Sequence, residues 1–110
     1  MFRITYNKGF YLTFANGITI SVQWGHSNYC DNRDVSYKAL VATEAGHPVP
    51  ESKTAEIAIW DKKRRWITKK ANRALRRPAI NDDVIGYLSP EEVARFIAWA
   101  ARQKTKVTKE

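Results

Sequence analysis

The most chemically distinctive stretch of this sequence is a run of positive charge in its second half. Nine lysines and arginines lie between positions 62 and 77 with no acidic residue among them: Lys62, Lys63, Arg64, Arg65, Lys69, Lys70, Arg73, Arg76 and Arg77. Trp60 and Trp66 flank the first of these cations. Cations bind phosphates and indole rings stack on bases, so the combination predicts a surface that binds single-stranded nucleic acid. The alternative is a solvated basic face, with both tryptophans packed in the core.

A second group of polar side chains follows a predicted strand into a loop rich in asparagine and aspartate. Its candidate ligand-binding or partner-binding residues are Gln23, Trp24, His26, Asn28, Tyr29 and Asp31. Polar loops of this kind often carry function, and these side chains are suited to capturing a partner through hydrogen bonds. The alternative is that they hydrogen-bond to the loop's own backbone and hold it in place.

The same loop contains two side chains that metals and nucleophilic catalysis use. His26 and Cys30 could both ligate zinc, but such a site needs three or four ligands and His47 stands alone, so no metal or other cofactor is expected. Cys30 could act as a nucleophile with His26 as its base. A lone cysteine is more often a small buried hydrophobe, and we expect that role for Cys30.

Other catalytic patterns are not visible in the sequence. We find no phosphate-cradling glycine loop, nucleophile elbow or Ser/His/Asp arrangement, and no recognition helix, zinc-finger spacing or RNA-binding aromatic signature. The adjacent acids Asp82-Asp83 and Glu91-Glu92 are explained by turn and capping roles. The sequence therefore predicts a binding protein rather than an enzyme.

Length and composition limit the class of protein. The chain has 110 residues, 44% of them hydrophobic, and a formal net charge of +8, which favours a polyanionic partner. We expect one domain over residues 1–104, with a charged, frayed tail over 105–110. The single cysteine and the lack of a long apolar run predict a cytoplasmic protein with no disulfide framework and no membrane partner. Assembly into homo-oligomers stays open.

The stretch from Phe10 to Gly25 predicts the hairpin around which the fold is organised. Two apolar alternations flank Asn16-Gly17, the strongest short-range hairpin signal. A two-residue loop would put the two apolar rows on opposite faces, so we predict a three-residue loop with Gly17 left-handed. That register pairs Phe14 with Ile18, Leu12 with Ile20 and Phe10 with Val22. The other face then carries a polar strip that meets water or a ligand: Tyr11, Thr13, Thr19, Ser21 and Gln23.

The remaining elements complete an α+β fold. We predict strands near residues 2–6, 55–60, 65–67 and 84–88, and either an irregular segment or a short helix over 68–77. Ser89, Pro90 and Glu92 form a capping-box start for a helix reaching about Gln103. The segment 35–43 is ambiguous between strand and helical turn, and 44–53 reads as a connection. The predicted fold is an antiparallel sheet of five or six strands, meander plus hairpin, packed by one C-terminal helix; a closed barrel is the alternative.

Three segments together resemble a family of small accessory proteins encoded by bacteriophages and prophages: FANGITISVQWG…NYCDNRD, AEIAIWDKKRRW and DDVIGYLSPEEVARFI. The resemblance spans most of the chain and brings no catalytic residues. Members often have an Asp-Gly type turn where this chain has residues 61–65, so the basic run departs from the family pattern. The resemblance therefore implies a shared site near residues 23–31 and a role in the host cytoplasm.

Two functional hypotheses follow. The first is a phage-encoded, non-enzymatic binding protein that antagonises host defence by capturing a defence protein or a phosphate-bearing nucleotide signal through the 23–34 loop and nearby cations. The second is a nucleic-acid-binding protein that uses the 62–77 run with Trp60 and Trp66.

Overall fold

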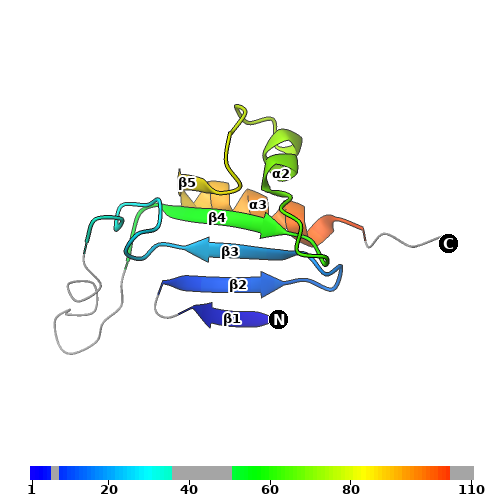
Figure 1. The fold of residues 1–110 in the computed structure, drawn as a ribbon, viewed down its shortest axis with the longest axis horizontal. Coiled ribbons are helices and arrows are strands. Elements are labelled where there is room, and N and C mark those ends of the chain that lie inside the picture. The colour runs from blue at the N-terminus through cyan, green and yellow to red at the C-terminus, as the bar shows by residue number, and fades with distance from the viewer. Residues whose placement is uncertain (6–7, 36–50, 105–110) are drawn as a thin grey trace.

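The computed structural model describes residues 1–5, 8–35 and 51–104. Its five strands form one antiparallel sheet in the order of the chain: β1 (Phe2–Thr5), β2 (Gly9–Thr13), β3 (Thr19–Gln23), β4 (Ala55–Trp60) and β5 (Ile85–Leu88). Two helices accompany the sheet, α2 (Thr68–Ala74) and α3 (Pro90–Arg102) (Figure 1). The predicted α+β class is confirmed, and the sheet is open rather than closed into a barrel, with β1 and β5 as its edges.

The β2–β3 hairpin has the predicted register. Phe10 pairs with Val22 and Leu12 with Ile20, and Phe14 N donates to Ile18 O at 2.9 Å. Gly17 has a φ of 87°, the left-handed conformation that glycine adopts without steric cost. The side chain of Asn16 anchors this turn, because its Nδ2 donates to Ala100 O and Gln103 O at the end of α3.

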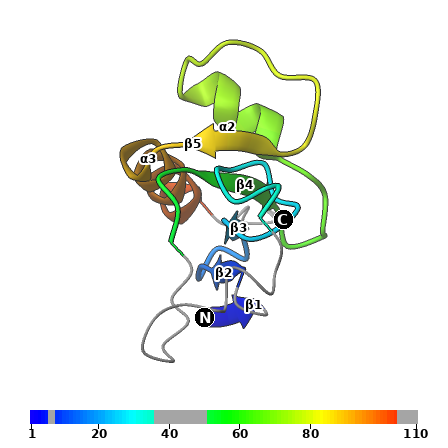
Figure 2. The same ribbon diagram turned by 90° about the vertical axis from the view of Figure 1, so that its left-hand side faces the viewer.

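One face of the sheet forms the core together with α3. Ile20, Ile57 and Ile59 are fully buried on this face, and Phe96 of α3 packs against them. Figure 2 shows α3 on one side of the sheet, where it contacts β3, β4 and β5 and also helix α2. On β1, by contrast, Phe2 and Ile4 remain 86% and 83% exposed.

Helix α3 begins with the predicted capping box. Ser89 Oγ accepts from Glu92 N, and the Glu92 carboxylate accepts from Ser89 N. Glu92 Oε2 also lies 2.8 Å from Arg77 Nη1. The Ser89 backbone N–H and the Arg77 guanidinium lower the pKa of Glu92 to about 2, since both interactions favour the charged carboxylate. Arg77 thereby links the segment after α2 to the start of α3.

Some predicted elements differ from the structure. Residues 65–67 do not form a returning strand; Trp66 makes only an isolated bridge to Trp60. Ile67 N still donates to Ile59 O, but the backbone ladder stops there, because the hydroxyl of the fully buried Thr68 bonds Ile59 N and Ile59 O where α2 begins. The short-helix alternative for 68–77 is confirmed by α2. Residues 36–50 and the tail 105–110 lie outside the described part of the chain, so the predictions there are not tested.

In the part of the chain that the structure describes, neither helix has the length and apolar character that a membrane span requires.

Candidate functional site

The candidate site lies on the face of the sheet opposite α3. Strand pairing aligns Thr13 with Thr19, Thr19 with Trp60 and Trp60 with Trp66, which makes one continuous row across four segments. The next row begins with Arg3 opposite Tyr11. Because paired residues in a sheet point to the same face, these side chains are neighbours in space. The row therefore joins the predicted polar strip to the start of the basic run.

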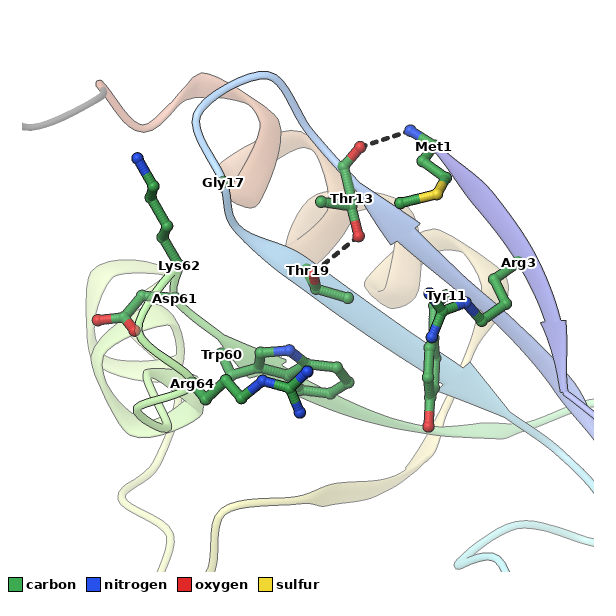
Figure 3. A pocket seen from close by; sticks show the side chains of 10 residues that line it. All are labelled: Met1, Arg3, Tyr11, Thr13, Gly17, Thr19, Trp60, Asp61, Lys62 and Arg64. Carbon is green, nitrogen blue, oxygen red and sulfur yellow. Dashed lines mark hydrogen bonds between the residues drawn. The ribbon is translucent and has the colours of Figure 1, made fainter.

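A pocket of about 430 Å³ opens on this face (Figure 3). Figure 3 shows Arg3 with Tyr11 on one side, Lys62 on the other side and the Arg64 guanidinium beside Trp60, with the hydroxyls of the two threonines between Arg3 and Lys62. Its complete lining is Met1, Arg3, Tyr11, Thr13, Gly17, Thr19, Trp60, Asp61, Lys62 and Arg64. The pocket thus combines cations, hydroxyls and aromatic rings.

Three aromatic rings form a chain that begins in the pocket with Tyr11 and Trp60 and ends outside its lining at Trp66. Tyr11 meets Trp60 edge to face with ring centroids 5.3 Å apart, and Trp60 meets Trp66 in the same way at 5.6 Å. Such pairs hold the rings in fixed orientations. Trp66 is 54% exposed, so much of its indole surface is accessible. The alternative interpretation, in which both tryptophans pack in the core, does not hold for Trp66.

The turn after β4 carries the cations of the pocket. Asp61 organises it: Oδ1 accepts from Lys63 N and Arg65 N, and Oδ2 pairs with Arg65 Nε at 2.9 Å. These hydrogen bonds, led by that of the Arg65 backbone, lower the pKa of Asp61. The carboxylate is therefore occupied by its own turn. Lys62 and Arg64, which line the pocket, make no ion pair with the described residues.

Arg64 has a conformation that is unfavourable for its residue type. Its φ is 64°, in the left-handed region that costs roughly 1–2 kcal/mol for a residue with a Cβ. Glycine would take this position without that cost. Strain of this kind clusters at functional sites, and here it falls on a side chain that lines the pocket.

The structure divides the nine predicted cations into two groups. Arg65 pairs with Asp61, and Arg77 pairs with Glu92 and lies over the Phe96 ring at 5.6 Å. Arg77 thus contacts the α3 side of the molecule. The others are exposed and have no ion-pair partner among the described residues: Lys62, Lys63, Arg64, Lys69, Lys70, Arg73 and Arg76. Of these seven, only Lys62 and Arg64 line the pocket.

The predicted capture loop uses its polar groups to hold its own shape. Asn28 Oδ1 accepts from Gly25 N, while Asn28 Nδ2 and Tyr29 N donate to the Glu56 carboxylate on β4. Thr54 Oγ1 accepts from Asp31 N and donates to Asp31 Oδ1. Asn28 and Asp31 therefore fasten the loop to β4 and the residue before it. Tyr29, by contrast, is 42% exposed, and the Arg33 guanidinium lies over its ring, 5.4 Å from the ring centroid.

The other three residues predicted for this loop, Gln23, Trp24 and His26, do not contact Glu56 or Thr54 through the hydrogen bonds just described. Gln23 is buried on the polar face and bonds Thr5 Oγ1, Phe10 O and Ser21 Oγ. Trp24 packs against the core with its ring 6.0 Å from that of Phe10. His26 is exposed, and its Nδ1 lies 2.8 Å from Val35 O. The loop and the pocket are thus separate sets of residues, and Gln23 and Trp24 belong to the body of the sheet.

Cys30 is almost completely buried, with 1% of its surface exposed. Burial raises the pKa of its thiol above the ordinary value. A protonated thiol is a poor nucleophile and a poor metal ligand. Among the described residues, no group of three or more histidine, cysteine, aspartate or glutamate side chains is placed to hold a metal ion.

The polar strip of the β2–β3 hairpin is more enclosed than a solvated face. Thr19, Ser21 and Gln23 are each less than 10% exposed. Sequence reasoning anticipated that this strip could meet a ligand, but it did not connect Arg3 to it or join it to the 61–65 turn. The signal for Arg3 was present, since the alternation Phe2, Arg3, Ile4 places Arg3 on the polar face.

A second, more open hollow of about 580 Å³ lies beside the loop. Its charged lining residues are Asp31, Glu51 and Lys53, so the lining has a net negative charge, whereas the lining of the first pocket has a net positive charge. It is therefore a poor site for an anion.

Comparison with protein-family models, with curated proteins and with solved structures found no match to this chain, so its site is interpreted from its own geometry.

Proposed function

We propose that this protein is a non-enzymatic binding protein whose ligand is single-stranded nucleic acid. The observation that carries the proposal is the pocket of Figure 3, which Arg3, Lys62 and Arg64 line together with the edge-to-face pair of Tyr11 and Trp60. Cations beside aromatic rings provide the two interactions that bind unpaired nucleotides, phosphate neutralisation and base stacking.

The electrostatics of the pocket favour an anionic ligand. Asp61 is its one acidic lining residue, and that carboxylate is taken up by the backbone and side chain of its own turn. The net charge of +8 adds a long-range attraction that speeds the approach of a polyanion at low salt. Lys69, Lys70 and Arg73 on α2 are exposed and add to the positive charge of the molecule.

The aromatic rings favour a single strand over a duplex. Bases in a duplex are stacked on one another and present only their edges, whereas an unpaired base presents its face to a ring. Trp66 offers such a surface at the end of the aromatic chain. Stacking of this kind contributes roughly 1–3 kcal/mol per base and is tolerant of sequence.

A host-directed role stays a proposal that rests on the phage-family resemblance. Capture of a host protein is the second candidate function, and one observation favours it. Tyr29 and Tyr87 are 42% and 54% exposed, and Tyr87 N donates to Tyr29 O, so two accessible rings come from adjacent segments beside Arg33. Tyrosine and arginine are enriched at protein interfaces.

The test of nucleic-acid binding is the salt dependence of affinity for a short oligonucleotide. The variant Lys62→Gln/Lys63→Gln/Arg64→Gln removes three cations from the turn after β4. We expect weaker binding of oligouridylate at low salt. The slope of log affinity against log salt should be flatter by about 0.7 for each phosphate that the variant no longer neutralises. Fluorescence anisotropy at several salt concentrations measures both quantities.

The matched control removes three charges from elsewhere. Lys53→Gln/Arg76→Gln/Arg95→Gln lowers the net charge equally, and these three exposed residues do not line the pocket. It should leave the slope nearly unchanged. Equal reductions of affinity in the two triple variants would mean that only overall charge matters, and no binding by the wild-type protein at low salt would end the proposal.

A further inference from the structure

We infer that the pocket is a subsite for a single ribonucleotide and that the hydroxyl pair of Thr13 and Thr19 recognises its 2′-hydroxyl group. This inference rests on the proposed function and narrows the ligand from single-stranded nucleic acid to single-stranded RNA. Its support comes from the size of the pocket, the placement of its charges and an unused hydrogen-bonding capacity between its two basic sides.

The size of the pocket fits one nucleotide. Its volume of about 430 Å³ falls at the lower end of the range for small-ligand sites, roughly 300–1,000 Å³. A base can lie against Tyr11 and Trp60, whose rings are held at 90° to each other. Arg3, 6.0 Å from the Tyr11 ring, and Arg64, beside Trp60, supply guanidinium groups for the phosphates.

The hydroxyl pair lies where the sugar of such a nucleotide would be. Thr13 Oγ1 and Thr19 Oγ1 are 2.8 Å apart, and Figure 3 shows them between the two basic sides. A hydrogen bond between two hydroxyls uses one of their two hydrogens. Neither hydroxyl has a second partner among the described residues. The pair therefore keeps one donor and several acceptor positions.

This remaining capacity matches the group that distinguishes RNA from DNA. The ribose 2′-hydroxyl is both a donor and an acceptor, so it can complete the hydrogen bonding of the pair. A deoxyribose has only a C–H group at its 2′ position, so the threonine hydroxyl hydrogen that the Thr13–Thr19 bond does not use would be left to bond water. One net hydrogen bond between neutral groups corresponds to a preference of about fivefold.

The experiment compares two oligonucleotides that differ only in the 2′-hydroxyl, oligouridylate and oligodeoxyuridylate of equal length. We expect the wild-type protein to bind the RNA about fivefold more tightly. Thr13→Val/Thr19→Val keeps β-branched side chains in the strands and removes both hydroxyls, so it should bring the ratio to about one while affinity for the DNA changes less than about twofold. Thr13→Ser/Thr19→Ser keeps both hydroxyls and should keep the ratio.

The outcomes separate this inference from the proposed function. Equal affinity of the wild-type protein for the two oligonucleotides overturns the ribose subsite and leaves single-strand binding intact. An unchanged ratio in Thr13→Val/Thr19→Val, or an equally weakened affinity for both oligonucleotides, also overturns it, because the hydroxyl pair would then not be the discriminating group. Failure to bind either oligonucleotide overturns the proposed function and the inference with it.

Discussion

Gly17→Val is expected to lower the free energy of unfolding by about 2 kcal/mol or more. A valine there must adopt a φ near 87°, which a β-branched residue reaches only at high steric cost. Its Cβ would also lie 2.9 Å from Lys62 Cβ, closer than such atoms approach one another. For a domain of this size the change corresponds to a fall in melting temperature of roughly 10 °C, measurable by circular dichroism.

Ala15→Val is the matched control for this change. It adds the same β-branched side chain to the same turn, at an exposed residue whose φ is not positive. We expect a change within about 0.5 kcal/mol. If Gly17→Val melts like the wild-type protein, the turn does not have the left-handed conformation that fixes the hairpin register.

Arg64→Gly is expected to change stability and binding in opposite directions. Removing a Cβ from a residue with a φ of 64° relieves strain and should stabilise the protein by about 1 kcal/mol. The same change removes a guanidinium from the pocket and should weaken binding of single-stranded RNA about tenfold at low salt, as expected when one charge-assisted hydrogen bond is removed. Urea unfolding and anisotropy titration give the two quantities.

A second left-handed arginine provides the control. Arg76 has a φ of 58° and is exposed, but it does not line the pocket. Arg76→Gly removes the same charge and relieves similar strain, so it should gain similar stability while affinity stays within about twofold. Equal weakening of affinity in both variants would argue that Arg64 acts through net charge alone.

Much of the fold could be predicted because its signals are local. The Asn16-Gly17 turn with its apolar alternations determines the β2–β3 register, and Ser89, Pro90 and Glu92 define the start of α3. The returning strand at 65–67 was wrong because the decisive contact is not local. Thr68 binds the backbone of Ile59 through its side chain, and periodicity does not reveal such a bond.

The candidate site was predictable only in pieces. The basic run and the polar strip were each visible, but they meet because β3 pairs with β4 across a long intervening segment. The asparagine-rich loop shows the opposite error. The side-chain types that hydrogen-bond a ligand are the same types that hold a loop in place. Here Asn28 bonds Gly25 within the loop and Glu56 on β4, and Asp31 bonds Thr54.

The most direct measurement follows the four tryptophans during titration with single-stranded RNA. Each indole N–H gives its own resonance in a ¹⁵N-correlated NMR spectrum, and tryptophan-to-phenylalanine variants assign them. Trp60 and Trp66 belong to the proposed site, whereas Trp24 packs beside Phe10 and Trp99 is buried on α3. Binding at the proposed site predicts saturable shifts for Trp60 and Trp66 with little change for the other two. Shifts confined to Trp24 or Trp99, or no shifts at low salt, would contradict it.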